Sequence, residues 1–416
     1  MNSGELVMNV KKTILFLFII LLFAFNSLLG QTTINGRLID EYYFPVPDVK
    51  IVVSNGGSVK TAADGSFQIT TTKMPYDLTV VDISNSMAML YRGLFSTAPE
   101  ITLLGGLPPR NVNSEAVKVE FPPVPRDHSA LIKFVSNDLF YSEPVTAFAN
   151  DRSKIITVSW PQSFNSVNGK IMYIEKTGTS YDKYSEKVYT VLRDFYLQQV
   201  RFDSNIAFQN PGDAFITVYL PTTDYTKKGF TVSADFLSFN RNSELLLNTY
   251  EGDIIYTKSL VPLNLSYGFR LKVLGYSYSG DGFGFSNINY AYPGSVLTIQ
   301  AETPPKLTAP QDKFYGVNAS TEFGYEWGSG SGLYVIHFHC FDPAADFYVV
   351  TKEKFISSPL VTGASVLKGD EYSWRVFKYL PYVTIDDFVE QRKFKNDVGY
   401  RAITQSEVRT FRKKPY

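Results

Sequence analysis

The sequence predicts an all-β protein made of tandem β-sandwich domains after an N-terminal signal peptide. Two observations predict this fold class. Short runs in which apolar and polar residues alternate recur along the chain, and a period of two places apolar side chains on one face of a sheet. Aromatic residues make up 15% of the chain, which has 28 Tyr and 32 Phe, and this composition favours strands over helices.

The first 30 residues have the pattern of a secretory signal peptide. Lys11 and Lys12 precede an apolar run over residues 13–25, and the small residue Gly30 stands before the expected cleavage point. The run is shorter than the ~20 apolar residues that a membrane-spanning helix needs. We therefore expect cleavage after Gly30, no membrane span in the mature chain, and an exported protein that is periplasmic, cell-surface or secreted.

The charge balance excludes one class of partner. The chain has 40 basic and 40 acidic residues, and 38 and 39 remain without residues 1–30, which hold Lys11, Lys12 and Glu5. Phosphate binding needs a basic excess, so we expect no nucleic acid partner. Cys340 is the single cysteine, so no internal disulfide can form and stability depends on apolar burial and sheet pairing.

The first predicted domain spans residues 31–107 and is centred on the turn at Asp64 and Gly65. Glycine accepts the positive φ of a tight hairpin turn, and aspartate bonds to its own backbone nearby. Three patterns follow one another here, at residues 36–40, 45–53 and 61–67. Their order resembles the carboxypeptidase regulatory-like domain, a small transthyretin-like β-sandwich, over residues 32–106. The resemblance implies a domain that scaffolds and binds, without catalytic residues of its own.

Two further sandwiches are expected to follow the Gly-Gly and Pro-Pro cluster at residues 105–109 and to end at residue 303. Strand-like runs separated by turn residues are typical of such domains. These runs lie at 117–121, 130–135, 155–160, 170–175, 188–193, 214–220, 230–239, 253–258, 267–274 and 296–301. A division into 108–206 and 207–303 gives each half enough strands to bury a sheet. One large sandwich over 108–303 is the alternative.

The last predicted domain spans residues 304–416 and ends in a basic tail. The strand-like runs at 323–327, 334–338, 367–376 and 400–411 follow an opening Leu307 and Pro310. This order resembles a fibronectin type III-like domain, which implies a buried Trp in one sheet and a Tyr near the start of the opposing strand. The connection over 378–399 departs from that family, and we expect in it a short helix capped by Asp386.

The most ligand-like stretch lies between residues 276 and 292. Its aromatic residues alternate with Ser, Gly and Asn, a mixture that binding loops favour because rigid rings give contact area and small polar residues give adaptable hydrogen bonds. The candidate ligand-binding residues are Tyr276, Tyr278, Phe283, Phe285, Tyr290 and Tyr292. The alternative is a long hairpin whose aromatic side chains pack into the sandwich core.

His337 and His339 are the residues whose types and spacing suit a metal. On a strand they share one face, whereas Cys340 points the opposite way. A structural site would need two more ligands, and only Asp342 or Asp346 lies near in sequence. We therefore expect no metal and no cofactor, with Cys340 as a small buried residue.

The chain shows no catalytic motif, so we expect a protein that is not an enzyme. It has three histidines and no Gly-x-Ser-x-Gly nucleophile elbow. None of the histidines has a Glu three residues on, as the zinc carboxypeptidases require. We expect a binding or scaffold module for a carbohydrate or an envelope or surface protein. The alternative is an accessory or degenerate component of a secreted, carboxypeptidase-associated hydrolase system.

Overall fold

The structure is a computed structural model that describes residues 31–195, 198–203, 208–236, 244–252, 255–265, 269–328, 330–358, 368–390 and 401–413. The predicted signal peptide, residues 1–30, lies outside the described residues. Strands dominate the described chain, which confirms the predicted all-β, sandwich-like fold. We group the strands in chain order into four units: β1–β7, β8–β14, β15–β21 and β22–β30.

The first unit packs two layers of strands around one apolar core. Strands β4-β1-β7 form one layer, and β3-β2-β5-β6 form the other. The predicted turn is confirmed: Gly65 has φ +77°, and the Ser66 N–H donates to the Asp64 carboxylate at 3.0 Å. The strands are β1 (Thr32–Asp40), β2 (Lys50–Val53), β3 (Ser58–Lys60), β4 (Ser66–Thr71), β5 (Tyr76–Asp82), β6 (Met87–Leu94) and β7 (Glu100–Leu103), with a 3-10 turn η1 (Ile83–Asn85) before β6.

The second unit is a sandwich of the sheets β10-β9-β12-β13 and β11-β8-β14. Trp160, Phe134 and Tyr173 are among the large side chains buried between these sheets. The strands are β8 (Val112–Glu120), β9 (His128–Val135), β10 (Val145–Ala147), β11 (Ser153–Pro161), β12 (Ser166–Thr177), β13 (Ser180–Leu192) and β14 (Gln198–Arg201). This unit therefore supplies a core of its own.

The third unit packs the sheet β18-β15-β21 against the strands β17-β16-β19-β20. Strand β19 shows the alternation that the sequence predicts, with every second residue buried from Leu271 to Ser277. The strands are β15 (Asp213–Tyr219), β16 (Lys227–Asp235), β17 (Glu244–Glu251), β18 (Tyr256–Pro262), β19 (Arg270–Tyr278), β20 (Gly284–Ala291) and β21 (Val296–Thr298). Residues 253 and 254 of the predicted strand at 253–258 lie outside the described residues, and β18 begins at Tyr256.

The last unit places the sheet β22-β24-β27 over strands β25, β26 and β28. Trp374 is buried there, and the Tyr372 hydroxyl donates to the Gly369 carbonyl at the start of the same strand. The strands are β22 (Lys306–Ala309), β23 (Phe314–Val317), β24 (Glu322–Glu326), β25 (Leu333–Phe341), β26 (Ala344–Thr351), β27 (Phe355–Ser357), β28 (Glu371–Leu380), β29 (Arg401–Gln405) and β30 (Arg409–Lys413).

The expected helix exists, but its predicted cap is wrong. Helix α2 (Ile385–Val389) has Thr384 as its N-cap, and the Thr384 hydroxyl accepts from the Asp387 N–H at 3.0 Å. Asp387 accepts in return from the Thr384 N–H, which completes a capping box. Asp386 instead accepts from the backbone N–H groups of Phe95 and Ser96 in the first unit. The carboxylate therefore fastens α2 to the first unit.

One 14-stranded sheet runs through three of the units, a feature that the sequence does not predict. Its path is β17-β16-β19-β20-β29-β28-β25-β26-β6-β5-β2-β3, with β23 and β30 alongside. Strand β20 pairs with β29, and β26 pairs in parallel with β6. Because this sheet crosses the predicted limits at 107 and 303, the domain boundaries stay a prediction.

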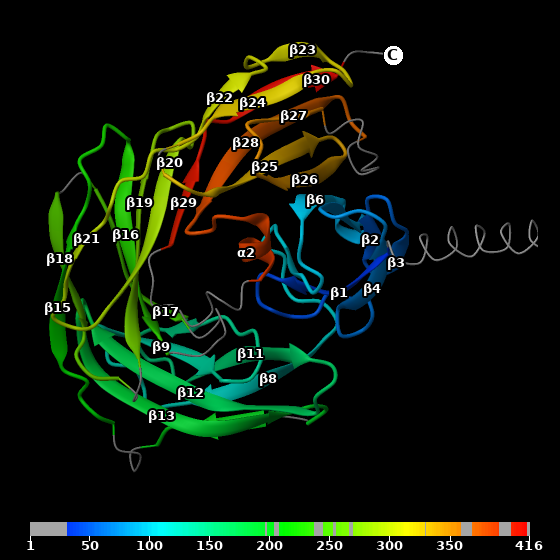
Figure 1. The fold of residues 1–416 in the computed structure, drawn as a ribbon. Coiled ribbons are helices and arrows are strands. Elements are labelled where there is room, and N and C mark those ends of the chain that lie inside the picture. The colour runs from blue at the N-terminus through cyan, green and yellow to red at the C-terminus, as the bar shows by residue number, and fades with distance from the viewer. Residues whose placement is uncertain are drawn as a thin grey trace, which may run out of the picture.

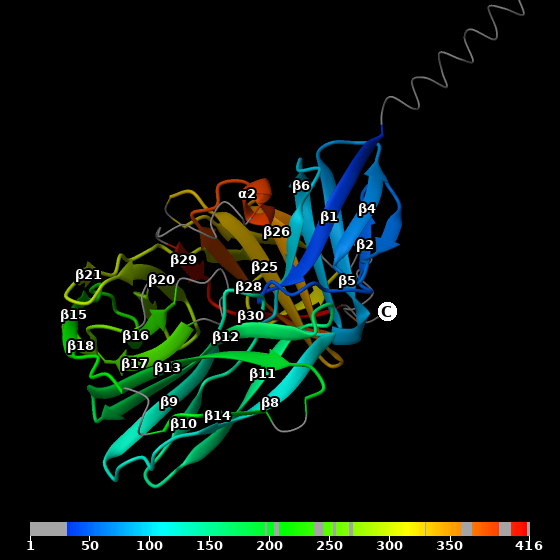
Figure 2. The ribbon, with the colours of Figure 1, turned by 90° about the horizontal axis from the view of Figure 1, so that it is seen from below.

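The four units form a ring in chain order (Figure 1). Pairing of β6 with β26 joins the first unit to the last, and pairing of β20 with β29 joins the last to the third. Tyr181 of the second unit shares an apolar cluster with Ile216 of the third. The second unit returns to the first where Tyr42 packs edge-on against Tyr141 at 4.9 Å, and Figure 2 shows these units together from below.

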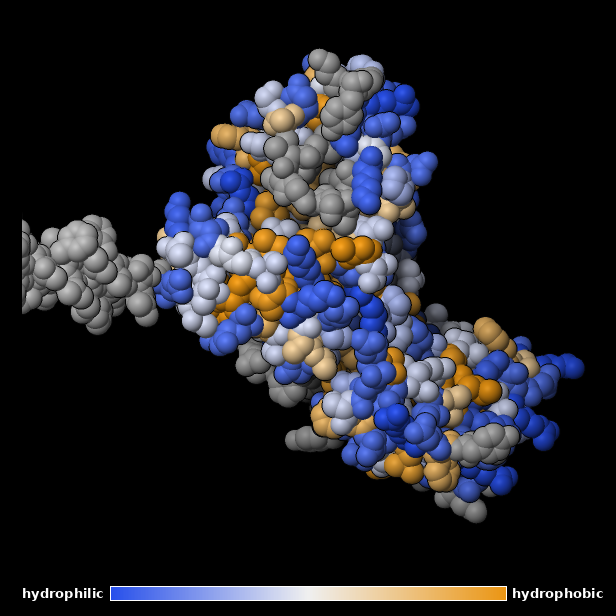
Figure 3. Space-filling model, turned by 90° about the vertical axis from the view of Figure 1, so that its right-hand side faces the viewer, coloured by the Kyte–Doolittle hydropathy of each residue, from blue (hydrophilic) through white to orange (hydrophobic). Residues whose placement is uncertain are grey.

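The surface is mixed in polarity. Viewed from the side of the first unit, hydrophilic residues surround areas of apolar residues (Figure 3). Ile83 and Phe95 are large apolar residues of that unit with exposed side chains. Among the described residues, no helix reaches the length and apolar character needed to cross a membrane.

Candidate functional site

The predicted aromatic stretch is a hairpin, and the structure divides its residues between two faces. Phe285 is buried in the core of the third unit, whereas Tyr292 at the end of β20 is 64% exposed. Phe283 in the turn packs edge-on against Tyr225 at 5.8 Å. Half-buried positions on the face opposite the core are held by Tyr276, Tyr278 and Tyr290. The six candidates therefore do not form one site.

The tyrosines on the outer face make two separate contacts. Tyr276 and Tyr278 stack with ring centroids 6.3 Å apart. The Arg270 guanidinium lies over the Tyr290 ring at 3.6 Å, a cation–π contact. These contacts show ordinary ring packing on a sheet face, and the face is half-buried.

The tyrosine pair and the histidine pair lie on the same face of the 14-stranded sheet. In the register, Tyr278 pairs with Gly284, Gly284 with Gln405, and Gln405 with Phe377. Residues in one such row point to one face. Burial raises the pKa of Tyr278, and the positive charge of Arg375 acts against this rise. The two candidates therefore share a sheet face, but the strands β20, β29 and β28 separate them.

Both histidines form a hydrogen bond with the same carboxylate, that of Asp346. Strand β26 places Asp346 opposite His339, so its Oδ1 lies 2.6 Å from His337 Nε2 and 3.0 Å from His339 Nδ1. Burial lowers the pKa of His337. Burial alone would raise the pKa of Asp346, but the hydrogen bonds from both histidines lower it overall. Cys340 is buried on the opposite face, as predicted.

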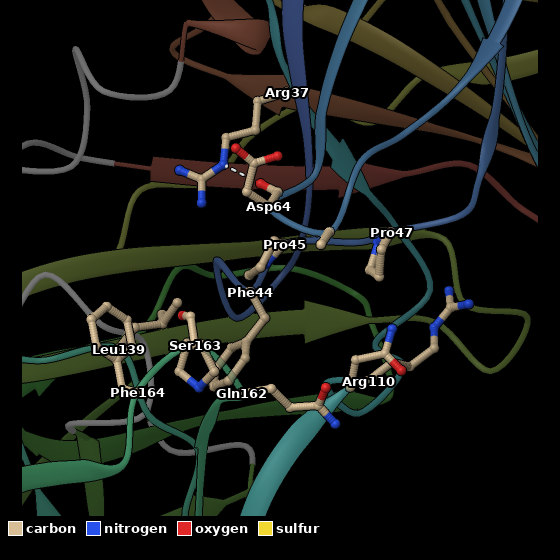
Figure 4. Close-up of a pocket in the computed structure, with 13 residues that line it drawn as sticks. Arg37, Phe44, Pro45, Pro47, Asp64, Arg110, Leu139, Gln162, Ser163 and Phe164 are labelled. Atoms are coloured by element: carbon tan, nitrogen blue, oxygen red, sulfur yellow. Dashed lines mark hydrogen bonds between the residues drawn. The ribbon is translucent and has the colours of Figure 1, made fainter.

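A pocket of about 760 Å³ lies between the first and second units (Figure 4). The upper wall comes from the first unit, and the lower wall comes from the second unit. Its lining consists of Arg37, Phe44, Pro45, Pro47, Ala63, Asp64, Arg110, Asn111, Leu139, Pro161, Gln162, Ser163 and Phe164. The turn at Asp64, around which the first unit is organised, therefore faces the second unit across this pocket.

Two arginines and two carboxylates set the charge of this region. The Arg37 Nε–H donates to the Asp64 carbonyl at 3.1 Å. Hydrogen bonds from Ser66 hold the pKa of the Asp64 carboxyl below its usual range. Arg110 forms an ion pair with the buried Asp82. Two guanidinium groups and two carboxylates thus give this region no net charge, and Arg110 is the arginine that is ion-paired with a carboxylate.

The opposite wall presents an exposed aromatic ring. Phe164 is 59% exposed, although its backbone is fixed. The Phe164 carbonyl accepts from the Asn113 carboxamide at 2.7 Å and from Trp160 Nε1 at 2.8 Å. Trp160 is buried in the core of the second unit. The core thus positions a ring that projects into the pocket (Figure 4).

Asp40 shapes the turn that carries the pocket residue Phe44. Its Oδ1 accepts from the N–H groups of Tyr42 and Phe44 at 2.8 and 2.9 Å. Burial raises the pKa of this carboxyl to about 6, because the charged form loses hydration, although the two backbone hydrogen bonds act the other way.

Asp40→Asn is expected to stabilise the protein at neutral pH, by up to about 3 kcal/mol. Between pH 3.8 and about 6 the folded Asp40 binds more protons than the unfolded one, so wild-type stability falls as pH rises through this window. Asparagine keeps the acceptor oxygen and does not ionise. Urea unfolding at pH 4 and pH 7 should show the advantage of the variant growing with pH.

Asp64→Asn is the matched control for this pH effect. The pKa of Asp64 is lowered in the folded protein, so its ionised form favours folding. The stability of this variant relative to wild type should therefore not rise as pH rises, which is the opposite of the trend expected for Asp40→Asn. A constant difference between Asp40→Asn and wild type across pH 4–7 would contradict the account of Asp40.

A hydroxyl, an imidazole and a carboxylate also meet in the second unit, away from the pocket. His128 Nε2 lies 2.9 Å from the Thr177 hydroxyl, and His128 Nδ1 lies 2.7 Å from Glu175. In a hydrolase triad the hydroxyl proton goes to the imidazole. Here the Thr177 hydroxyl donates to Asp182, and Lys183 bonds to Glu175 at 2.9 Å. The group is thus an ion-pair network, and its hydroxyl is not activated.

Comparisons with known proteins give no family. No protein-family model matches the chain, and no curated protein does. The solved structure of a Ca²⁺-stabilised adhesin that helps an Antarctic bacterium reach out and bind ice is 9% identical to this chain; the match covers 91% of this chain and 98% of the adhesin chain, with a TM-score of 0.18. BcpA, the major pilin subunit of Bacillus cereus, is 10% identical with coverages of 65% and 99% and a TM-score of 0.14. The FN1–FN3 domains of chicken CNTN1 are 13% identical, with coverages of 67% and 90% and a TM-score of 0.13. Likenesses this low carry no functional argument.

Sequence reasoning identified the Asp64 turn and the histidines but missed the pocket. Residues 161–164 lie between the predicted strands at 155–160 and 170–175, and Arg110 follows the boundary cluster at 105–109, so no motif marks either of them. A pocket between units depends on how the units meet, and no local pattern encodes that contact. The single local signal is Phe164, a large aromatic residue inside a polar turn.

Proposed function

We propose that this protein is an exported, non-enzymatic β-sandwich protein that binds a saccharide in the pocket between its first and second units. The pocket is the observation that carries the proposal. Its volume of about 760 Å³ falls within the range of about 300–1,000 Å³ that is usual for small-ligand sites. Export is supported by the signal-peptide pattern of residues 1–30.

The lining chemistry favours a hydroxyl-rich, neutral ligand. Arg37, Asp64 and Gln162 offer hydrogen-bond donors and acceptors toward one space. Phe164 adds a flat apolar face, which suits the C–H face of a sugar ring. Because the nearby guanidinium and carboxylate charges balance, directed hydrogen bonds and ring contact would provide the affinity.

The absence of catalysis is part of the proposal. Among the described residues that line the pocket, Ser163 is the only hydroxyl residue, and there is no histidine or cysteine. A nucleophilic hydroxyl needs an adjacent base. We also assign the first unit to the carboxypeptidase regulatory-like domains and the last to the fibronectin type III-like domains, which supports a binding role for the whole chain.

Phe164→Ala is expected to weaken saccharide binding by tenfold or more, about 1.4 kcal/mol, when the chain without residues 1–30 is screened on a glycan array. Phe148→Ala is the matched control, because Phe148 is an exposed Phe of the same unit, 62% exposed against 59% for Phe164. It should leave binding unchanged.

Two further variants locate the site. Tyr278→Ala and Phe283→Ala should bind like wild type, because these residues lie on the third unit. Loss of binding in these two with retention in Phe164→Ala would move the site to the aromatic hairpin. If the wild-type protein binds no glycan, the saccharide proposal is wrong and the role as a scaffold for surface proteins becomes the better one.

A further inference from the structure

The group His337, His339 and Asp346 has the composition and geometry of a transition-metal site. Each residue offers one ligand atom, and the three atoms lie within 4.8 Å of one another. They come from the neighbouring strands β25 and β26, whose register fixes their relative positions. The group lies on strands rather than loops, so its backbone is held by ladder hydrogen bonds on both sides of β25.

Aromatic neighbours fix the orientation of both imidazole rings. His337 stacks on Tyr348 with centroids 4.4 Å apart and an angle of 4° between the planes. His339 meets the ring of Phe341 edge-on at 5.3 Å. His337 is 12% exposed and His339 35%. One side of the group is therefore packed, and the side near His339 is accessible to solvent and to an ion.

The distances suit a small ion with short bonds. Zinc binds His nitrogen at about 2.0–2.1 Å and carboxylate oxygen at about 2.0–2.2 Å, which puts tetrahedral ligand atoms about 3.3 Å apart. Asp346 Oδ1 already lies 2.6 Å from His337 Nε2 and 3.0 Å from His339 Nδ1. Small side-chain rotations would thus replace two hydrogen bonds by coordination.

The donor set also selects the kind of metal. Imidazole nitrogen suits zinc, copper and nickel, whereas calcium and magnesium need several oxygen ligands. Only one carboxylate is present in the group. Arg375 of β28 lies opposite His337 of β25 in the sheet register, and its positive charge disfavours a bound cation. Its guanidinium lies over the Phe377 ring at 4.7 Å, a cation–π contact that favours this position of the side chain.

Against the expectation of no metal from the sequence, we propose that His337, His339 and Asp346 bind a zinc ion, with Asp346 as one of the two missing ligands and water as the fourth. The site lies beside the seam between the last and first units. Asp346 pairs with Met87 of β6, and its N–H donates to the Ser86 carbonyl at 3.0 Å. Zinc would therefore tie β25 to β26, the strand of the last unit that pairs with β6 at this seam, and bound zinc would raise the melting temperature of the protein.

Zinc binding can be measured on protein without a histidine tag, freed of metal by chelation, by calorimetric titration with zinc chloride. Cobalt chloride is the spectroscopic probe, because tetrahedral cobalt gives visible absorption bands. We expect one site per chain and a higher melting temperature with zinc. His339→Gln and Asp346→Asn should weaken binding at least about tenfold and abolish the rise in melting temperature.

His128→Gln is the matched control. His128 is the one remaining histidine of the chain and is bonded to Glu175 and Thr177. The control should bind zinc like wild type. The proposal is overturned if wild type binds no zinc at 100-fold molar excess, if His339→Gln binds as tightly as wild type, or if only His128→Gln loses binding. Melting curves of the metal-free variants confirm that each is folded.

Discussion

Gly65→Ala is expected to destabilise the protein by about 2–5 kcal/mol. Gly65 has φ +77°, and a Cβ there would lie 2.3 Å from the Leu38 carbonyl oxygen and 3.3 Å from Pro45. The carbonyl belongs to the β1 backbone, so it cannot swing aside. The Leu38 N–H also donates to the Gly65 carbonyl at 2.8 Å, so moving the turn would cost that bond as well.

Gly93→Ala separates the two causes of this loss. Gly93 has φ +79°, nearly the same as Gly65, but a Cβ there would have no heavy atom within 4 Å. The loss of stability in Gly93→Ala should therefore reflect the backbone conformation alone, and we expect it to be about 1–2 kcal/mol. Urea unfolding of both variants gives the difference due to the clash. Equal losses would show that the turn at Gly65 relaxes without cost.

The small local features of the fold could be predicted from sequence because they depend on neighbours in the chain. The Asp64 turn needs one glycine and one short polar side chain, and both are adjacent. Alternation along β19 puts Leu271 and Val273 in the core because a strand has a period of two. The burial of Cys340 and the shared face of the two histidines follow from the same rule.

The ring and its sites depend on contacts between distant segments. Without β26, strand β6 would be an edge strand of the first unit with unpaired backbone groups. Nothing in the residues of β6 or of β26 specifies that these two strands pair. The helix cap illustrates a smaller version of the same problem. Both Thr384 and Asp386 are good N-cap residues, and the contact of Asp386 with Phe95 and Ser96 decides between them.

The same limit applies to the candidate sites. Alternation predicts that His337 and His339 share a face, but only the register of β25 with β26 brings Asp346 opposite His339. The pocket needs the Asp64 turn of one unit and Phe164 of another. For the histidines the structure thus selects Asp346 over Asp342, both of which the sequence offers, whereas the partner of the Asp64 turn in the pocket comes from the tertiary structure alone.

Trp160→Ala is expected to cost about 3–5 kcal/mol of stability and also to weaken saccharide binding at the pocket. Trp160 is 1% exposed, and its removal leaves a cavity in the core of the second unit. The variant also removes the Nε1–H that donates to the Phe164 carbonyl at 2.8 Å. The turn would then be held by Asn113 and by its own backbone bond from the Phe164 N–H to the Pro161 carbonyl.

Two variants divide the effect of Trp160 into its parts. Trp160→Phe keeps a six-membered aromatic ring but not the Nε1–H donor, so this variant should lose about 1–2 kcal/mol of stability. Phe164→Ala removes an exposed ring and should change stability by less than about 0.5 kcal/mol while still losing saccharide binding. Urea unfolding measures stability, and the glycan array, read well below each melting temperature, measures binding. A Trp160→Ala protein that is folded and binds saccharide like wild type would show that the core does not position Phe164.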